Sequence, residues 1–149
     1  MSTTRKVRTI SGTAEQIWEV LGKFDGISQW APNVDHSCLL TVQSSQAGTV
    51  RRIQTGSLTV VEEVTEWEPN QRLAYTIGGL PPGVQFVGNT WTIEPIGDQS
   101  KVTLTTIIEP GPKPAHKLVA KAISRKLAGA SDQMLDGLSA AVAQRRTQS

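Results

Sequence analysis

The stretch from Ala115 to Gln144 decides the fold, and it reads AHKLVAKAISRKLAGASDQMLDGLSAAVAQ. Pro110, Pro112 and Pro114 precede it, as is common just before a helix begins. Its apolar residues recur at steps of three and four: Leu118, Val119, Ala122, Ile123, Leu127, Ala130, Met134, Leu138, Ala141 and Val142. This spacing predicts an amphipathic helix. At the usual rise per residue the helix is about 45 Å long, which is enough to cross a whole sheet.

The segment from Val34 to Glu109 has the pattern of consecutive antiparallel strands, because β-rich runs alternate with residues that favour turns. The six predicted strands are Val34–Val42, Gly48–Gln54, Leu58–Trp67, Arg72–Ile77, Gln85–Glu94 and Lys101–Glu109. Period-2 alternation predicts that Leu73, Tyr75 and Ile77 face inward. The connection from Gly78 to Gly83 leaves Leu80 exposed between glycines, and it is either a plain turn or the border of a cavity mouth.

The N-terminal segment predicts a strand followed by two short helices. Lys6–Ile10 is the strand, and Thr13 with Gln16 has the spacing of a capping box, in which each side chain bonds the other residue's backbone N–H. The helix that begins there should end at Gly22. Phe24 to Trp30 predicts a second, brief helix, because apolar residues recur three apart.

Length and composition favour one globular domain, which we predict to span residues 1–149. No apolar run approaches the roughly 18 residues that a membrane span needs, and residues 1–8 are not followed by the apolar region of a secretory signal. The single cysteine, Cys38, cannot form an internal disulfide, which fits a reducing compartment. We therefore expect a cytoplasmic protein. A net charge of +2 is too small to argue for a nucleic-acid partner.

Several motifs resemble those of the START-like, or Bet v 1-like, superfamily (SRPBCC). ISGTAEQIWEVLGKFDGISQW (residues 10–30), followed by APNV, is similar to that superfamily's opening. EEVTEWEP (62–69), RLAY (72–75) and WTIEP (91–95) before Gly97 resemble its polyketide cyclase/dehydrase and lipid-transport branch. The resemblance covers nearly the whole chain, and Gly22-Lys23 departs from it where many relatives carry an aspartate. It implies an α+β helix-grip fold, in which a curved seven-stranded antiparallel sheet wraps a long C-terminal helix.

A strongly curved sheet closed by one helix leaves a concavity, and we expect it to hold a small hydrophobic ligand. Strand alternation and helix phase predict these lining residues: Trp30, Ile53, Leu58, Val60, Glu62, Leu73, Tyr75, Phe86, Trp91, Leu104, Leu118, Ala122 and Met134. The alternative for each of them is close packing in the core.

Glu62 is the sharpest of these predictions, because Leu58, Val60 and Val64 share its strand face. Either this face points inward or that of Glu63 does, and a bulge would reverse the phase. A buried Glu62 would have a raised pKa and suit proton transfer. Glu62 and Tyr75 are therefore the candidate catalytic residues, although orienting the ligand's polar end is the alternative for Glu62 and a core position for Tyr75.

The sequence lacks the motifs for metal, phosphate and dinucleotide binding. His36 and His116 do not have the spacing of metal ligands, so we predict no metal site. No phosphate-binding loop or dinucleotide fingerprint is present, and we expect no cofactor. Basic residues gather at Lys113, Lys117, Lys121, Arg125 and Lys126. This basic face is either a solvated helix surface or a contact for a membrane or another anionic partner.

Three functions remain open. The first is a carrier or sensor of a lipid, polyketide or related metabolite, acting as a monomer or homodimer. The second is a polyketide cyclase, aromatase or dehydratase that uses Glu62 or Tyr75 for proton transfer. The third is an interaction domain with a filled core, which docks through its basic helix face.

Overall fold

The computed structural model describes residues 1–148, so Ser149, the last residue of the predicted domain, lies outside the described range. Its elements are β1 (Ser2–Ile10), α1 (Ala14–Leu21), the 3₁₀ helix η1 (Phe24–Gln29), β2 (His36–Leu39), β3 (Val50–Thr55), β4 (Leu58–Glu68), β5 (Arg72–Gly78), β6 (Val84–Ile96), β7 (Gln99–Pro110) and α2 (His116–Gln148). In this range no helix combines the length and hydropathy that a membrane span requires.

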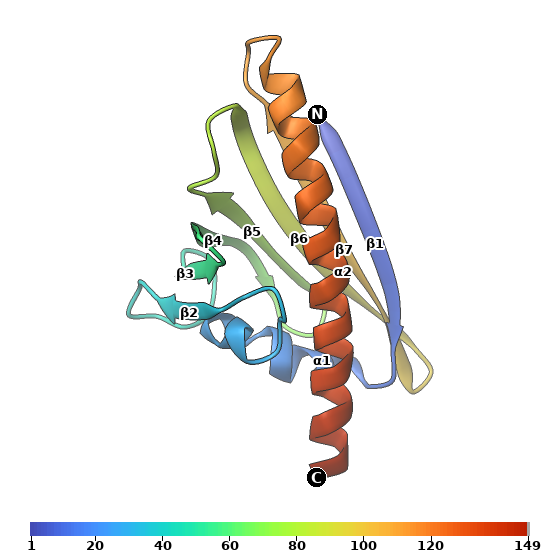
Figure 1. Cartoon of the computed structure of the whole chain (residues 1–149). Coiled ribbons are helices and arrows are strands. Elements are labelled where there is room, and N and C mark those ends of the chain that lie inside the picture. The colour runs from blue at the N-terminus through green and yellow to red at the C-terminus, as the bar shows by residue number, and fades with distance from the viewer. Residues whose placement is uncertain (149) are drawn as a thin grey trace.

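The seven strands form one sheet in the order β1-β7-β6-β5-β4-β3-β2, and every neighbouring pair is antiparallel. The sheet curves around α2, which lies along its concave face (Figure 1). The chain passes through α1 and η1 between β1 and β2. The predicted α+β helix-grip fold is confirmed.

Two strands, β1 and β2, differ most from the prediction. β1 begins at Ser2 instead of Lys6, because it pairs with β7 as far as Ser2 opposite Ile108. The sequence of β1 is polar and shows no apolar alternation there, so only the pairing reveals the extra residues. β2 is limited to His36–Leu39, because its pairing with β3 runs only from His36 opposite Gln54 to Leu39 opposite Arg51, and Val42 in the following loop is fully exposed.

The predicted capping box starts α1. The backbone N–H of Gln16 donates to Thr13 Oγ1 at 3.2 Å, and the backbone N–H of Thr13 donates to Gln16 Oε1 at 2.9 Å. These bonds satisfy two donors that the first turn of a helix leaves without partners. They fix the direction in which α1 leaves β1, and therefore which face of α1 meets the core.

The larger core cluster joins α1 and the second half of α2 to the sheet, through residues such as Ile17, Leu104, Leu135 and Leu138. α2 contacts the other elements unevenly. Its main contacts are with strands β7 and β1 and with helix α1. Strands β3, β4 and β5 curve away from that contact. A bulge in β4, between Val64 and Glu66, adds to the curvature. The space left between these strands and the first half of α2 is where the candidate site lies.

Candidate functional site

A cavity of about 260 Å³ lies between α2 and the facing strands β3, β4 and β5. Most of its wall is apolar, for example Ile53 and Val60 from the sheet and Leu127 and Met134 from α2. The polar residues of the wall are Asn33, Thr55, Ser57, Glu62, Tyr75, Asn89 and Lys126. A concave, mainly apolar space with a few convergent polar groups is the usual form of a small-molecule site.

Six of the thirteen residues predicted to line a pocket lie on this wall: Ile53, Leu58, Val60, Glu62, Tyr75 and Met134. Five of them come from β3, β4 and β5, where successive side chains alternate between the two faces of the sheet. Their contact with a ligand stays a prediction.

Four other predicted residues pack into the core instead of lining the cavity. Leu73, Trp91 and Leu104 are at most 1% exposed and belong to the larger core cluster. Trp30 is half-buried, and its ring meets Trp91 edge-on with 6.1 Å between ring centres. These four side chains therefore pack in the core, which is the alternative that the sequence left open for each of them.

The prediction was wrong for Phe86, Leu118 and Ala122, which are exposed. Phe86 is an odd number of residues from Trp91, so a continuous strand places the two on opposite faces, and Trp91 is the one that points inward. Leu118 and Ala122 share a helix face that turns outward, because the inward residues of this half of α2 are Ala120, Ile123 and Leu127.

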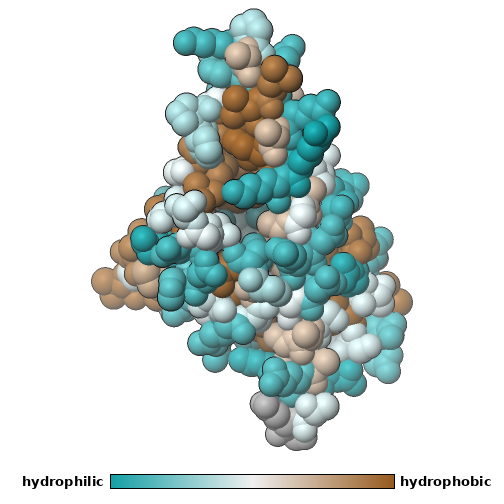
Figure 2. All heavy atoms as spheres, viewed as in Figure 1, coloured by the Kyte–Doolittle hydropathy of each residue, from teal (hydrophilic) through white to brown (hydrophobic). Residues whose placement is uncertain are grey.

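Leu80 was expected to be exposed and is instead half-buried on the cavity wall beside Pro81. The loop that carries them approaches α2 closely, since a Cβ placed on Gly83 would lie only 2.8 Å from Val119 Cγ1. Figure 2 shows apolar surface gathered over this end of the molecule, with hydrophilic side chains on either side of it. Lys126 is exposed on α2 and also belongs to the cavity wall.

Glu62 is buried at 5% exposure, whereas Glu63 is exposed, so the face that carries Glu62 is the inward one. The bulge in β4 follows Val64 and does not reverse this phase. Glu62 Oε1 accepts a hydrogen bond from Arg51 Nε at 2.8 Å and lies 2.7 Å from Arg51 Nη2. A buried acid thus reaches the cavity wall as half of an ion pair.

Arg51 is the most important residue that the sequence interpretation missed. It is 2% exposed, and its Nη1 donates to the backbone oxygen of Phe24 at 2.7 Å. Its guanidinium carbon lies 3.7 Å from the ring centre of Phe24 and 4.7 Å from that of Tyr75. The alternation that places Ile53 inward also places Arg51 inward, because the two are separated by two positions on β3.

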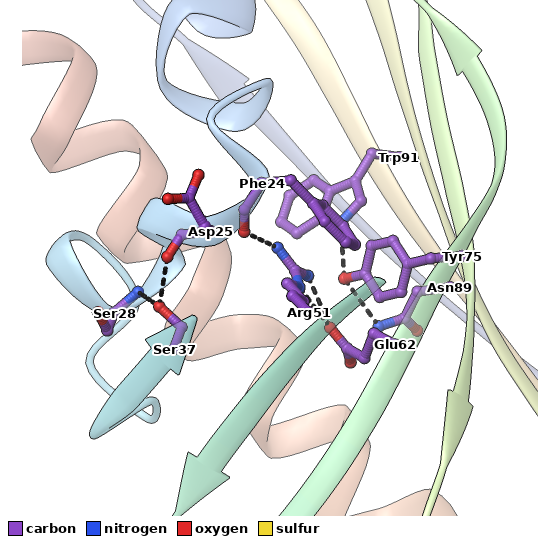
Figure 3. A network of polar contacts seen from close by, with 9 residues as sticks. All are labelled: Phe24, Asp25, Ser28, Ser37, Arg51, Glu62, Tyr75, Asn89 and Trp91. Atoms are coloured by element: carbon purple, nitrogen blue, oxygen red, sulfur yellow. Dashed lines mark hydrogen bonds and ion pairs between the residues drawn. The ribbon is translucent and has the colours of Figure 1, made fainter. Parts of the chain in front are cut away.

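The backbone carbonyl that Arg51 contacts belongs to Phe24, the first residue of η1, and hydrogen bonds at nearby residues tie η1 to β2. Ser37 on β2 donates from its hydroxyl to the backbone oxygen of Asp25 at 2.6 Å, and the backbone N–H of Ser28 donates to that hydroxyl at 3.1 Å. Figure 3 shows this small network beside the Arg51 and Glu62 pair. β2 and η1 are therefore hydrogen-bonded to each other close to the residue whose backbone oxygen accepts from Arg51.

Tyr75 lies at the centre of a second network. Its hydroxyl oxygen accepts from Trp91 Nε1 at 3.1 Å and from Asn89 Nδ2 at 3.3 Å (Figure 3). Asn89 Oδ1 accepts from Thr106 Oγ1 at 2.7 Å. Tyr75 is 2% exposed, so its hydroxyl lies inside the molecule and not at the rim.

Burial changes the protonation of both titratable groups. It raises the pKa of the Glu62 carboxyl above its ordinary value, and the adjacent Arg51 charge opposes that rise. Burial, followed by the negative charge of Glu62, raises the pKa of Tyr75 as well. Tyr75 therefore keeps its proton at neutral pH and is a neutral hydrogen-bond donor there.

The chemistry available at this wall is hydrogen bonding and proton transfer. Among residues 1–148 no group of three or more histidine, cysteine or acidic residues is placed to hold a metal ion. Two buried polar atoms in the described part of the chain lack a hydrogen-bond partner, namely Asn33 Oδ1, on a residue of the cavity wall, and Trp30 Nε1.

Comparison with known proteins gives a consistent result. The family model for polyketide cyclase/dehydrase and lipid transport proteins matches residues 1–143. The Zhui aromatase/cyclase from Streptomyces sp. R1128 has a similar structure, with a TM-score of 0.83 and 16% identity over 97% of this chain and 94% of that one. A START superfamily protein from Mycobacterium smegmatis has a TM-score of 0.73 and 17% identity, over 95% of this chain and 97% of its own.

Ara h 8.0201 is similar to the same degree, with a TM-score of 0.73 and 16% identity over 96% of this chain and 98% of that one. None of the curated proteins matches the sequence. Identities this low show the shared fold alone, whereas the family model matches almost the entire chain. The protein therefore belongs to the polyketide cyclase/dehydrase and lipid transport family.

Proposed function

We propose that this protein binds a small hydrophobic molecule in the cavity and acts as its carrier or sensor. The observation that carries the proposal is the cavity itself, which is mainly apolar and holds its buried polar groups on the sheet side. Burial of apolar ligand surface supplies the affinity, and the polar groups orient the ligand. The interaction domain with a filled core is disfavoured, because about 260 Å³ of the interior is not filled by side chains.

A cavity-blocking variant tests this function. Ala130 lies on the cavity wall, so Ala130→Phe places a ring in the space that a ligand would need. Ala140 is exposed on the same helix, so Ala140→Phe is the matched control. The probe is N-phenyl-1-naphthylamine, a neutral molecule whose fluorescence rises in apolar surroundings.

We expect wild type and Ala140→Phe to bind the probe equally, and Ala130→Phe to bind it about tenfold or more weakly. Equal binding by all three proteins would place the probe outside the cavity, and no binding by wild type would contradict the proposal. Native mass spectrometry of the purified protein, followed by extraction, would identify a retained natural ligand.

A second candidate function is proton-transfer catalysis in a cyclisation or dehydration, and one observation favours it. Glu62 and Tyr75 are buried acids of raised pKa on the wall of the cavity. In an enzyme of this kind, Glu62→Gln would abolish turnover while ligand binding persists. A cytoplasmic location, a monomeric or homodimeric state and contact of the basic helix face with a membrane remain predictions.

A further inference from the structure

Some polar groups of the cavity wall have no hydrogen-bond partner in the described part of the protein. These groups restrict which chemical class of ligand can bind. Both short contacts with Arg51 involve the same carboxylate oxygen of Glu62, Oε1. The other oxygen, Oε2, has no partner within residues 1–148, and Figure 3 shows it without a dashed line. Because Glu62 belongs to the cavity wall, this oxygen is an acceptor that a ligand can use.

Tyr75 offers a hydrogen-bond donor, which complements the acceptor on Glu62. Its oxygen accepts from Trp91 and Asn89, and the indole N–H of Trp91 can only donate. Thr106 donates to Asn89 Oδ1, which directs the NH₂ group of Asn89 toward Tyr75. Both bonds therefore use the lone pairs of the Tyr75 oxygen. The hydroxyl hydrogen has no acceptor in the described part of the protein, and Tyr75 also lies on the cavity wall.

A third wall residue points to the same kind of ligand. The side-chain oxygen of Asn33 is buried and has no hydrogen-bond partner among the described residues. An unpaired buried acceptor is costly, and a ligand that brings a donor removes that cost. The buried part of the wall thus offers two acceptors, Glu62 Oε2 and Asn33 Oδ1, and one donor, the hydroxyl of Tyr75.

The positive charge of Arg51 is not available to a ligand. Its Nε and Nη2 face Glu62, its Nη1 donates to Phe24, and the rings of Phe24 and Tyr75 lie close to the guanidinium. A carboxylate ligand would bring only acceptors toward Glu62 Oε2, and burial of an unpaired anion is unfavourable. The buried part of the polar wall therefore disfavours a fatty-acid anion that enters with its carboxylate group first.

We propose that the ligand is a neutral molecule with an apolar body and a hydroxyl group, an alcohol or a phenol, at its buried end. One hydroxyl satisfies both unused groups, because its hydrogen donates to Glu62 Oε2 while its oxygen accepts from Tyr75. This inference rests on the proposed function and adds to it the charge and the polar group of the ligand.

Three probes with the same apolar body test the proposal: 2-naphthol, naphthalene and 2-naphthoate. Their dissociation constants at pH 7 are measured by displacement of N-phenyl-1-naphthylamine. We expect 2-naphthol to bind about tenfold more tightly than naphthalene, because it gains two hydrogen bonds. We expect 2-naphthoate to bind most weakly of the three.

Two variants test which residues cause the preference for 2-naphthol. Tyr75→Phe should remove most of the advantage of 2-naphthol while the affinity for naphthalene stays the same. Glu62→Gln replaces the free acceptor and leaves the charge of Arg51 unbalanced, so 2-naphthoate should gain affinity relative to 2-naphthol. Glu63→Gln is the matched control, because Glu63 is exposed on the outer face of the same strand. It should leave all three affinities unchanged.

Each outcome decides between the two proposals. Binding of 2-naphthoate as tight as that of 2-naphthol overturns the hydroxyl proposal, and so does equal binding of all three probes, while ligand binding in the cavity stands in both cases. Failure of every probe, N-phenyl-1-naphthylamine included, overturns both proposals. Unchanged preference in Tyr75→Phe also overturns the hydroxyl proposal, because the oxygen of the ligand would then not accept from Tyr75. If Glu62→Gln does not fold, as thermal unfolding would reveal, Tyr75→Phe and the wild-type series decide alone.

Discussion

The two halves of α2 have similar apolar patterns and different surroundings. In the second half, Leu135, Leu138 and Val142 are completely buried. In the first half the only buried apolar residue is Ala120, Ile123 and Leu127 are half-buried, and Leu118 is 74% exposed. The comparison shows that helical spacing identifies an apolar face but does not say how tightly that face is packed.

The difference arises from what lies opposite each half. The second half meets α1 and the end of η1, and its Gly137 approaches so closely that a Cβ would overlap the backbone oxygen of Trp30. The first half faces strands that curve away, and the cavity separates it from β3, β4 and β5. The molecule thus has a closed half, which supplies stability, and an open half, which supplies the candidate site.

The largest effect should come from two glycines of the same helix. Gly137→Ala would place its Cβ against the Trp30 oxygen and 2.8 Å from Pro32 Cδ, so we expect a loss of about 3 kcal/mol in the free energy of unfolding. Gly129→Ala meets nothing within 4 Å and should gain about 1 kcal/mol from helix propensity. Urea unfolding of both variants measures the difference, and destabilisation of similar size in the two would contradict a closed and an open half.

Two leucines should give the next largest difference. Leu135 is completely buried in the closed half, so Leu135→Ala should lower the free energy of unfolding by about 3 kcal/mol. Leu127 is half-buried beside the cavity, and Leu127→Ala removes fewer contacts, so its cost should be about 1 kcal/mol. Thermal and urea unfolding provide the measurement. Equal costs would mean that the open half is packed as well as the closed one.

The smallest effect concerns charge. Lys6 on β1 lies 3.3 Å from Asp132 on α2, and both side chains are at least one-third exposed. Asp132→Asn should cost no more than about 0.5 kcal/mol, and the cost should shrink as salt is added. A loss comparable with that of Leu135→Ala, measured by urea unfolding at low salt, would show that charge and not packing holds α2 against β1.

Local patterns were sufficient to predict most of the individual helices and strands. The capping box at Thr13, the strand alternation around Leu73 and Tyr75, and the apolar steps of the C-terminal helix each depend on neighbouring residues in the chain. The resemblance to the superfamily then placed these elements in one architecture. The start of β1 escaped prediction, because its polar residues become a strand only by pairing with β7.

The candidate site was predicted in part for the same reason. Alternation assigned Tyr75 to the inner face of the sheet and left open whether Glu62 or Glu63 points inward, and it would have indicated Arg51 had that pattern been extended along β3. Which inward side chains reach the cavity, and which pack against one another as Leu73 and Trp91 do, depends on the distance between the sheet and α2. That distance is set by the curvature of seven paired strands and by one close contact at Gly137, so only the tertiary structure decided it.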